Sequence, residues 1–569
     1  MPPLHGSRRA RSLPALVTGI CVIGTMVTIF GGIAVASVTP GAGAPAVRHY
    51  GVVPYRTAPT TSGSVTPLAL TPRPAAAAAG RANPNTVVFG GGVLGLDDTT
   101  PIGVVTGPPK VYLVFWGSQW GSSSTVRVQG HGTYRAFQGD PDGVAPDLQA
   151  FFSGLGTGND GWSRVVTQYC QSGPGTPVAA GTATCPASAA HVSSPSGNVL
   201  AGIWEDPVAF SPTASASQLA QEAERAATHF GNTTPASNRN IDYVIVSPPG
   251  AHPAGFNTNN PQDDFCAWHD DSADNGINTP PNDGDVAFTN MPYVPDVGAG
   301  CGADAVNPTS PWGVDDGVTI IAGHEYAEWL SDPFPGGGWL NLTRGANYED
   351  EIADECTWIP SGQGAMTDIS LATGSFPVQS LWSNINGACE TTSIAFTATP
   401  SHQRAAAGAT IHPVKVPARD DEIGQVLRYT VVGLPTGLTI NPHTGLISGH
   451  LSGRPGTDRA RITVTDGIGI HSTRTIVWYV ENDVVLTRPA PQGTPTHHAV
   501  RLPVRARDLL SHRTLRFFAT GLPRGLLINA KTGVISGSTS ATRRAYSVTL
   551  TVTDSGGART TARFAWTVS

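Results

Sequence analysis

The feature that most constrains the fold is an internal duplication in the last third of the chain. The segment "GLPTGLTINPHTGLISG" (433–449) returns as "GLPRGLLINAKTGVISG" (521–537), and "ITVTD" (462–466) returns as "LTVTD" (550–554), both 88 residues later. Short apolar segments between Gly, Pro and Asn turns are typical of β-strands, and a repeat of this length accommodates one small β-sandwich. We therefore predict two tandem β-sandwiches.

The two repeats, 393–482 and 483–569, resemble the Ig-like family of cadherin-like bacterial surface domains. The shared signature G-L-P-x-G-L…T-G-x-I-S-G carries this resemblance. It implies an adhesive or spacer role, and calcium is a candidate ligand because cadherin-like relatives often bind it. Asp466, Asp554 and the acidic run at 420–422 are the residues available for calcium, although an Asp that only forms a turn is the commoner explanation of Asp466 and Asp554.

The N-terminus predicts export. Three arginines (Arg8, Arg9 and Arg11) precede an uncharged run, Leu13 to Val38, that is long enough to cross a bilayer. The basic flank belongs on the cytoplasmic side, which places the following residues outside the cell. The small-x-small sequence at 34–36 favours a removable signal peptide, and an uncleaved membrane anchor over 1–38 is the alternative. The expected location is extracellular or at the cell surface.

Residues 39–100 are rich in Pro, Ala, Thr and Gly, and they predict a disordered linker because they contain too few large apolar residues to form a core. The net charge of the chain is −7, without a long run of either sign, so we expect no nucleic-acid partner. The expected partner is an extracellular polymer or protein surface. Contact with a membrane is expected only through the N-terminal segment, if it is uncleaved.

Six cysteines define a disulfide-bonded region over 101–392. An even number of cysteines in an exported chain predicts disulfides, for which six cysteines allow fifteen pairings. Sequential pairing is favoured because it closes the shortest loops. The six are Cys170, Cys185, Cys266, Cys301, Cys356 and Cys389.

The same region mixes strand and helix patterns. Buried strands are predicted at 110–117 and within 240–250, and helical spacing is found at 146–155 and 216–230. A further helix is predicted from Asp316 to about Leu330, ended by Pro333. We expect an α+β domain, for which a zincin-like arrangement is one form.

The stretch "AGHEYAEWLSDP" (322–333) holds the candidate site. On a helix, His324 and Glu328 project from one face, one turn apart. A metal ion would satisfy both groups if they are buried, whereas a hydrogen-bonded core histidine is the simpler alternative. Glu325 occupies the position at which H-E-x-x-H enzymes keep the general base that activates metal-bound water.

Three further residues are candidate ligands. Glu351 and Asp354 lie in the acidic segment before Cys356, and His269 follows Cys266. A solvated acidic loop is the alternative interpretation of this segment. Histidine with carboxylates suits zinc, whereas Glu328 in place of a second histidine shifts the preference towards calcium, manganese or another ion that prefers oxygen ligands. We therefore expect a divalent metal ion, either zinc or calcium.

The region 101–392 also resembles the phosphate-induced protein 1 (exordium-like) family of secreted proteins. The resemblance rests on five motifs in the family's order: "TGPPKVYLVFWG" (106–117), "FCAWH" (265–269), "GHEYAEWLSDP" (323–333), "EIADEC" (351–356) and "VQSLWSNINGAC" (378–389). It implies an extracellular or cell-wall location and a role in growth or surface biology, and it brings no established reaction.

Two functions follow from the sequence. The first is a surface-associated metal-dependent hydrolase, peptidase-like, with Glu325 as the base and the two sandwiches as adhesion or spacer domains. The alternative is a non-catalytic secreted adhesion protein in which calcium or another metal serves structure.

Overall fold

The computed structural model describes residues 52–56, 83–94, 101–128, 132–257, 264–273, 284–342, 350–398, 400–452, 455–510, 513–555 and 557–569. The predicted signal or anchor segment (1–38) and most of the predicted linker lie outside these residues. Within the part of the chain that is described, no helix is both long and apolar enough to span a membrane.

A five-stranded sheet forms the centre of the first domain. Its strand order is β7 (Leu200–Asp206), β2 (Lys110–Trp116), β8 (Ile241–Val246), β10 (Ala287–Met291) and β9 (Trp268–Asp271). The first four strands pair in parallel, and β9 pairs antiparallel to β10 at the edge. Every residue of β8 and β10 is buried, as expected for parallel strands covered on both faces.

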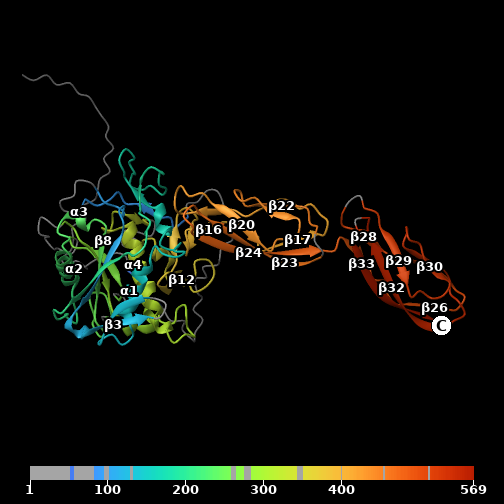
Figure 1. The fold of residues 1–569 in the computed structure, drawn as a ribbon, viewed down its shortest axis with the longest axis horizontal. Coiled ribbons are helices and arrows are strands. Elements are labelled where there is room, and N and C mark those ends of the chain that lie inside the picture. The colour runs from blue at the N-terminus through green and yellow to red at the C-terminus, as the bar shows by residue number, and fades with distance from the viewer. Residues whose placement is uncertain are drawn as a thin grey trace, which may run out of the picture. The chain divides into compact units, whose positions relative to one another are not determined.

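Helices cover both faces of this sheet. Val244 and Val246 of β8 share a core with α1 (Val144–Gly154) and α4 (Asp316–Ser331), whereas the alternate residues of β8 share a core with α2 (Ala216–Phe230). Figure 1 shows the three helices around β8. A mainly parallel sheet between helices is an α/β arrangement, so the α+β prediction is wrong in this respect. The cause is that β7 and β10 were not recognised as strands.

Short elements surround this core. The antiparallel pairs are β1 (Val88–Phe89) with β11 (Trp339–Leu340), β3 (Ser123–Val128) with β4 (Gly132–Phe137), β5 (Cys170–Gln171) with β6 (Ala190–His191), β12 (Thr367–Leu371) with β13 (Gly374–Val378), and β14 (Leu381–Ser383) with β15 (Ala388–Glu390). One further α-helix is α3 (Pro235–Asn238). The 3-10 helices are Ser118–Trp120, Val165–Gln168, Val294–Asp296, Gly298–Cys301, Gly313–Asp315 and Asp354–Cys356.

Three disulfides join the cysteines in sequential pairs, which confirms the favoured pairing: Cys170–Cys185, Cys266–Cys301 and Cys356–Cys389. Two of these disulfides hold the backbone next to candidate ligand residues. Cys266 lies just before β9, which carries His269, and Cys356 ends the 3-10 helix that begins at Asp354.

The two repeats have the same strand order, which confirms the tandem sandwiches. The first contains β16 (Ile394–Phe396) paired with β19 (Ala418–Asp420), a sheet of β17 (His402–Ala406), β24 (His471–Glu481), β23 (Gly456–Thr465) and β20 (Arg428–Val432), and a sheet of β18 (Val414–Lys415), β22 (Leu446–Gly449) and β21 (Leu438–Ile440). The second contains β25 (Val484–Leu486) paired with β28 (Ala506–Asp508), a sheet of β26 (Gln492–Thr494), β33 (Arg559–Val568), β32 (Arg544–Thr553) and β29 (Arg516–Thr520), and a sheet of β27 (Ala499–Pro503), β31 (Val534–Ser538) and β30 (Leu526–Ile528).

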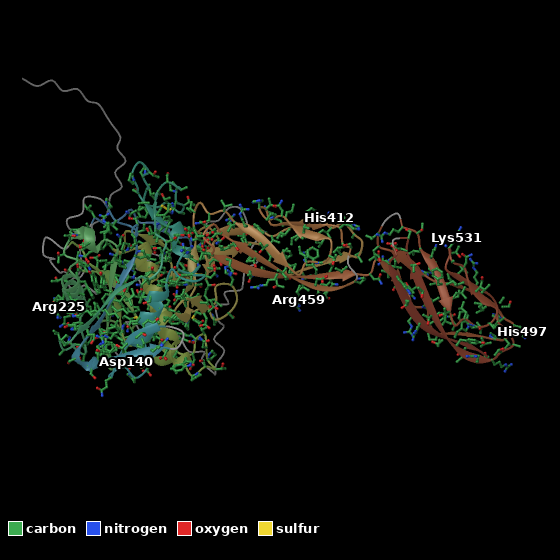
Figure 2. The ribbon with its side chains drawn as sticks, viewed as in Figure 1. Asp140, Arg225, His412, Arg459, His497 and Lys531 are labelled. Carbon is green, nitrogen blue, oxygen red and sulfur yellow. A yellow bond between two sulfur atoms is a disulfide. The ribbon has the colours of Figure 1, made fainter. Side chains whose placement is uncertain are left out.

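Each sandwich has its own core. Trp478 is buried in the first and Trp566 in the second, and the positions of the two tryptophans differ by the repeat offset of 88 residues. Charged residues such as Arg459 and Lys531 are exposed (Figure 2). The alternation of buried and exposed residues along β23 and β32 is typical of a sheet with one solvated face.

Candidate metal centre

Helix α4 carries three of the candidate site residues. All 16 residues of the helix are buried, so it is a core helix rather than an amphipathic surface helix. The helix ends where predicted, before Pro333. Asp332 stabilises the turn that follows, because its carboxylate accepts hydrogen bonds from the backbone N–H groups of Gly336 and Gly338.

His324 is held in one orientation by Gln379. Gln379 Nε2 donates a hydrogen bond to the carbonyl oxygen of Ala353 (2.8 Å), so Gln379 Oε1 faces His324 Nδ1 at 3.1 Å and accepts its proton. His324 Nε2 then points towards two carboxylates, 3.1 Å from Glu328 Oε2 and 3.4 Å from Asp354 Oδ1. A histidine ligand whose other ring nitrogen donates to a fixed acceptor is the usual arrangement at metal sites.

Glu328 presents one oxygen to the cluster. Its Oε1 accepts hydrogen bonds from the backbone N–H groups of Ala353 and Asp354, at 3.2 and 3.0 Å. Its Oε2, which faces His324, has no hydrogen-bond partner, and neither has His324 Nε2. The two atoms face each other as a buried ion pair, 3.1 Å apart.

His269 reaches the same place from the edge strand β9. Its Nε2 donates to the carbonyl oxygen of Asp332 at 3.2 Å, which leaves the lone pair on Nδ1. Nδ1 lies 3.3 Å from Glu325 Oε2 and 3.9 Å from Glu328 Oε2. Glu351 Oε2 lies 3.8 Å from His269 Nε2, and neither carboxylate oxygen of Glu351 has a hydrogen-bond partner.

Burial and mutual repulsion shift the pKa values of these groups. Burial lowers the pKa of His269 to about 3, so this imidazole is neutral. Burial, followed by the charge of Asp354, raises the pKa of Glu328 to about 7, and burial raises those of Glu325 and Glu351 well above the usual range. For His324, burial opposes the charged form, but Glu328 and Asp354 outweigh it and raise its pKa well above the usual value.

All six predicted site residues therefore lie in one cluster. Ligand atoms of His324, Glu328 and Asp354 fall within 4.8 Å of one another, and so do those of His269, Glu328 and Glu351. Glu325 joins the cluster through His269. Five of the six are at most 1% exposed, and Asp354, with 14% of its side chain exposed, is the member that solvent reaches. Buried nitrogen and oxygen atoms without hydrogen bonds are a donor set that fits a divalent cation.

Sequence reasoning missed Gln379. The residue lies in the motif "VQSLWSNINGAC", which was noted for its resemblance and not for chemistry. The sequence did contain a signal, because Gln379 is an amide side chain within a mostly apolar stretch, and a buried amide can orient a histidine ligand. Its partner could not be found from the sequence, since 55 residues separate Gln379 from His324.

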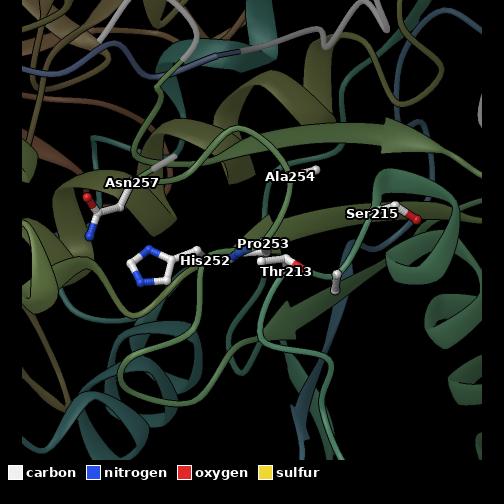
Figure 3. Close-up of a pocket in the computed structure, with 7 residues that line it drawn as sticks. Thr213, Ser215, His252, Pro253, Ala254 and Asn257 are labelled. Atoms are coloured by element: carbon white, nitrogen blue, oxygen red, sulfur yellow. The ribbon is translucent and has the colours of Figure 1, made fainter. Parts of the chain in front are cut away.

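A separate cavity of about 350 Å³ lies at the start of α2 and shares no residue with the cluster (Figure 3). It is lined by Thr213, Ala214, Ser215, His252, Pro253, Ala254 and Asn257. Ser215 caps α2, accepting a hydrogen bond from the N–H of Gln218, so this side chain has a structural role.

The second sandwich holds another acidic group, formed by Asp483, Asp508 and Asp554. Arg513 already supplies a cation here, because its Nη1 lies 2.9 Å from Asp483 Oδ2 and 2.6 Å from Asp554 Oδ2. Asp554, a candidate calcium ligand from the sequence, is thus paired with a guanidinium group.

Comparison with known proteins identifies the repeats. Residues 393–481 and 482–569 each match the family described as "Putative Ig domain". The repeats are Ig-like domains. Among the curated proteins no match was found for this chain. The match with the Ig family does not extend to residues 101–392, whose likeness to the phosphate-induced protein 1 family has no support in these comparisons and stays a prediction.

Similar solved structures include cadherin fragments. Drosophila N-cadherin EC1-3 is 15% identical (TM-score 0.16), over 37% of this chain and 78% of that one. Mouse Cadherin-23 EC22-24 is 17% identical (TM-score 0.17), over 31% and 64% of the two chains. A "putative alpha-galactosidase" from Bacteroides fragilis is 20% identical (TM-score 0.14), over 16% of this chain and 18% of that one. The low TM-scores mean that none of these likenesses describes the chain as a whole.

Proposed function

We propose that this chain is an extracellular surface-binding protein. Its two Ig-like domains serve adhesion or spacing, and its α/β domain holds a divalent metal ion on helix α4. The Ig-like domains support the extracellular part of the proposal, since such domains fit an exported protein. An extracellular polymer or protein surface is the proposed partner, and the basic and apolar segment at 1–38 is the proposed export signal.

One observation carries the metal site. His324 Nε2 and Glu328 Oε2 are fully buried and 3.1 Å apart, and Asp354 Oδ1 lies 3.4 Å from the same nitrogen, so one ring nitrogen and two carboxylate oxygens face one another. Burying charged partners costs desolvation that their mutual attraction repays only when the geometry is excellent. A cation between these atoms removes that cost, and the Gln379 hydrogen bond already holds the histidine in the tautomer that binds metal.

The donor set favours a transition metal over calcium. Calcium takes six to eight oxygen ligands, whereas two imidazoles reach this cluster. Zinc combines histidine with carboxylate ligands at about 2.0–2.2 Å, and manganese also accepts this mixture. We therefore propose zinc or manganese, and calcium becomes the less suitable of the two ions expected from the sequence.

A peptidase-like, metal-dependent hydrolase of zincin-like design is the second candidate, and the position of Glu325 supports it. Its Oε1 has no hydrogen-bond partner, while its Oε2 lies 3.3 Å from His269 Nδ1. A metal ion in this cluster would supply an activated water. Glu325 would accept the proton of that water, and His269 would orient the carboxylate of Glu325.

Elemental analysis of the purified chain tests the metal site. We expect stoichiometric zinc or manganese in the wild type and a loss of at least tenfold in occupancy in His324→Ala. His191→Ala is the matched control, because His191 lies on β6 and hydrogen-bonds Thr167 and Pro186 outside the cluster. Metal-free wild-type protein, after purification without chelators and reconstitution with either ion, contradicts the proposal.

Two further measurements separate the candidate functions. Glu325→Gln should retain the metal and abolish hydrolysis of an unfolded protein substrate if the hydrolase candidate is right, and unchanged hydrolysis excludes Glu325 as the base. For surface binding, the intact chain and a chain ending at residue 392 are sedimented with insoluble cell-wall polymer. Loss of sedimentation on truncation supports the role of the Ig-like domains, and equal sedimentation contradicts it.

A further inference from the structure

We propose that the cluster binds two divalent cations, bridged by the carboxylate of Glu328. This inference rests on the proposed metal centre and adds the number of ions and the role of each ligand. One ion would lie among His324, Glu328 and Asp354, and the other among His269, Glu328 and Glu351. Glu328 is the residue that both groups contain.

The ligand atoms are spread too widely for one ion. A cation about 2.0–2.2 Å from each ligand requires all ligand atoms to lie within roughly 4.4 Å of one another. Each group comes close to that limit, with its atoms within 4.8 Å of one another, whereas the five residues do not combine into one such group. An ion in the His324 group therefore leaves His269 and Glu351 outside its coordination shell.

Glu328 is oriented as a bridge. Its Oε1 is taken by the backbone N–H groups of Ala353 and Asp354. Its Oε2 lies 3.1 Å from His324 Nε2 and 3.9 Å from His269 Nδ1, so one oxygen faces the histidines of both groups. In two-metal sites the ions lie about 3.5–4 Å apart, a separation that a shared carboxylate spans.

The number of carboxylates in the cluster matches two divalent ions. Four carboxylates meet here: Glu325, Glu328, Glu351 and Asp354. Across the described residues, the ion pairs of these carboxylates involve only the two histidines and no lysine or arginine. If all four carboxylates release their protons on binding cations, two divalent ions balance the four negative charges, whereas one balances only two of them.

The environment of Glu351 distinguishes a site with two ions from a site with one. Among the described residues neither buried oxygen of Glu351 has a hydrogen-bond partner, and this residue does not belong to the His324 group. Its nearest ion-pair partner, His269 Nε2 at 3.8 Å, already donates its proton to Asp332. A second ion next to His269 is the partner that Glu351 lacks.

Manganese loading tests the number of ions. The full chain is stripped with chelator, reloaded with Mn²⁺ and desalted, and its manganese is counted by mass spectrometry and recorded by electron paramagnetic resonance. We expect two ions per chain with an exchange-coupled spectrum. Glu351→Gln and Asp354→Asn should each retain one ion with an uncoupled spectrum. Glu205→Gln is the control, because Glu205 on β7 pairs with Arg135 on β4, outside the cluster, and this variant should retain two ions.

The outcomes are distinguishable. One ion in the wild type, with the same count in Glu351→Gln, overturns the two-ion proposal and leaves the single metal site intact. No bound ion in the wild type overturns both. Circular dichroism checks the fold of each variant, and if Glu351→Gln does not fold, the wild-type spectrum still decides, because two uncoupled Mn²⁺ signals contradict a shared bridging oxygen.

Discussion

At the scale of single residues, the orientation of the proposed ligand His324 depends on a neighbouring side chain, Gln379. Gln379 links Ala353, next to the acidic segment, to His324 on α4, and so fixes which ring nitrogen of His324 faces the carboxylates. Partners of this kind typically change metal affinity by 10–100-fold when they are removed. At the proposed metal site, Gln379 would therefore orient a ligand without contacting the ion.

We predict that Gln379→Met lowers the affinity of the chain for Zn²⁺ about 10–100-fold, because His324 then loses the acceptor that orients it. Competition with a chromophoric chelator measures the dissociation constant. Gln363→Met is the matched control, since Gln363 is exposed and bonds the carbonyl of Cys389 and the side chain of Glu390, away from the cluster. Equal affinities in the two variants would show that Gln379 only fills space.

The helical spacing was enough to place His324 and Glu328 on one face, because an i, i+4 pair is a local property. It was not enough to decide which distant carboxylate approaches them. Glu351, Asp354 and His269 were all named as candidates, and the structure brings all three to the cluster. The division into two groups depends on the positions of β9 and of the 3-10 helix Asp354–Cys356, which no local pattern contains.

At the scale of elements, α4 is a helix without a solvent face, and its glycines reflect close packing. A Cβ atom on Gly317 would lie only 1.9 Å from the carbonyl oxygen of Cys301. Cys301 forms a disulfide with Cys266, which lies just before β9, the strand that carries His269. The position of α4 relative to β9, and thus of His324 relative to His269, depends on this close approach.

Gly317→Ala is expected to destabilise the α/β domain by about 2–4 kcal/mol. Alanine favours a helix over glycine by roughly 1 kcal/mol, but the contact with a fixed backbone carbonyl outweighs this gain. Urea unfolding measures the change. Gly493→Ala is the control, because no atom lies within 4 Å of the added methyl group. A stabilised Gly317→Ala protein would mean that α4 can shift freely.

Element boundaries were predicted well where the pattern was strong and local. The helix predicted at 216–230 is observed as Ala216–Phe230, with the Ser215 capping box that such a start favours. Strands β7 and β10 were missed. "LAGIWED" contains charged residues at its end, and "AFTNM" lacks the β-branched run that marks a buried strand, so only the neighbours in the sheet reveal them as strands.

At the scale of the whole molecule, the two Ig-like domains share an architecture but differ in how they compensate their acidic groups. Arg513 of the second repeat corresponds, by the 88-residue offset, to Gln425 of the first. We predict that Arg513→Gln destabilises the second Ig-like domain by about 3 kcal/mol, because it removes the guanidinium group that pairs with the buried Asp483 and Asp554. Calorimetry should show its transition lowered by roughly 10 °C or more. Arg524→Gln, at an exposed position, should change nothing, and an equal shift in both variants contradicts this role of Arg513.

Metal removal provides the test that uses the whole chain. The α/β domain and the two Ig-like domains have separate hydrophobic cores, so calorimetry should resolve the loss of metal as a change in one part. A ligand at a hundredfold excess over its dissociation constant stabilises a fold by about 2.7 kcal/mol. Chelation should therefore lower the transition of the α/β domain by about 5–10 °C and leave the Ig-like transitions in place, and added Zn²⁺ should restore it. If the Ig-like transitions fall and that of the α/β domain does not, the stabilising metal lies in the repeats and not on α4.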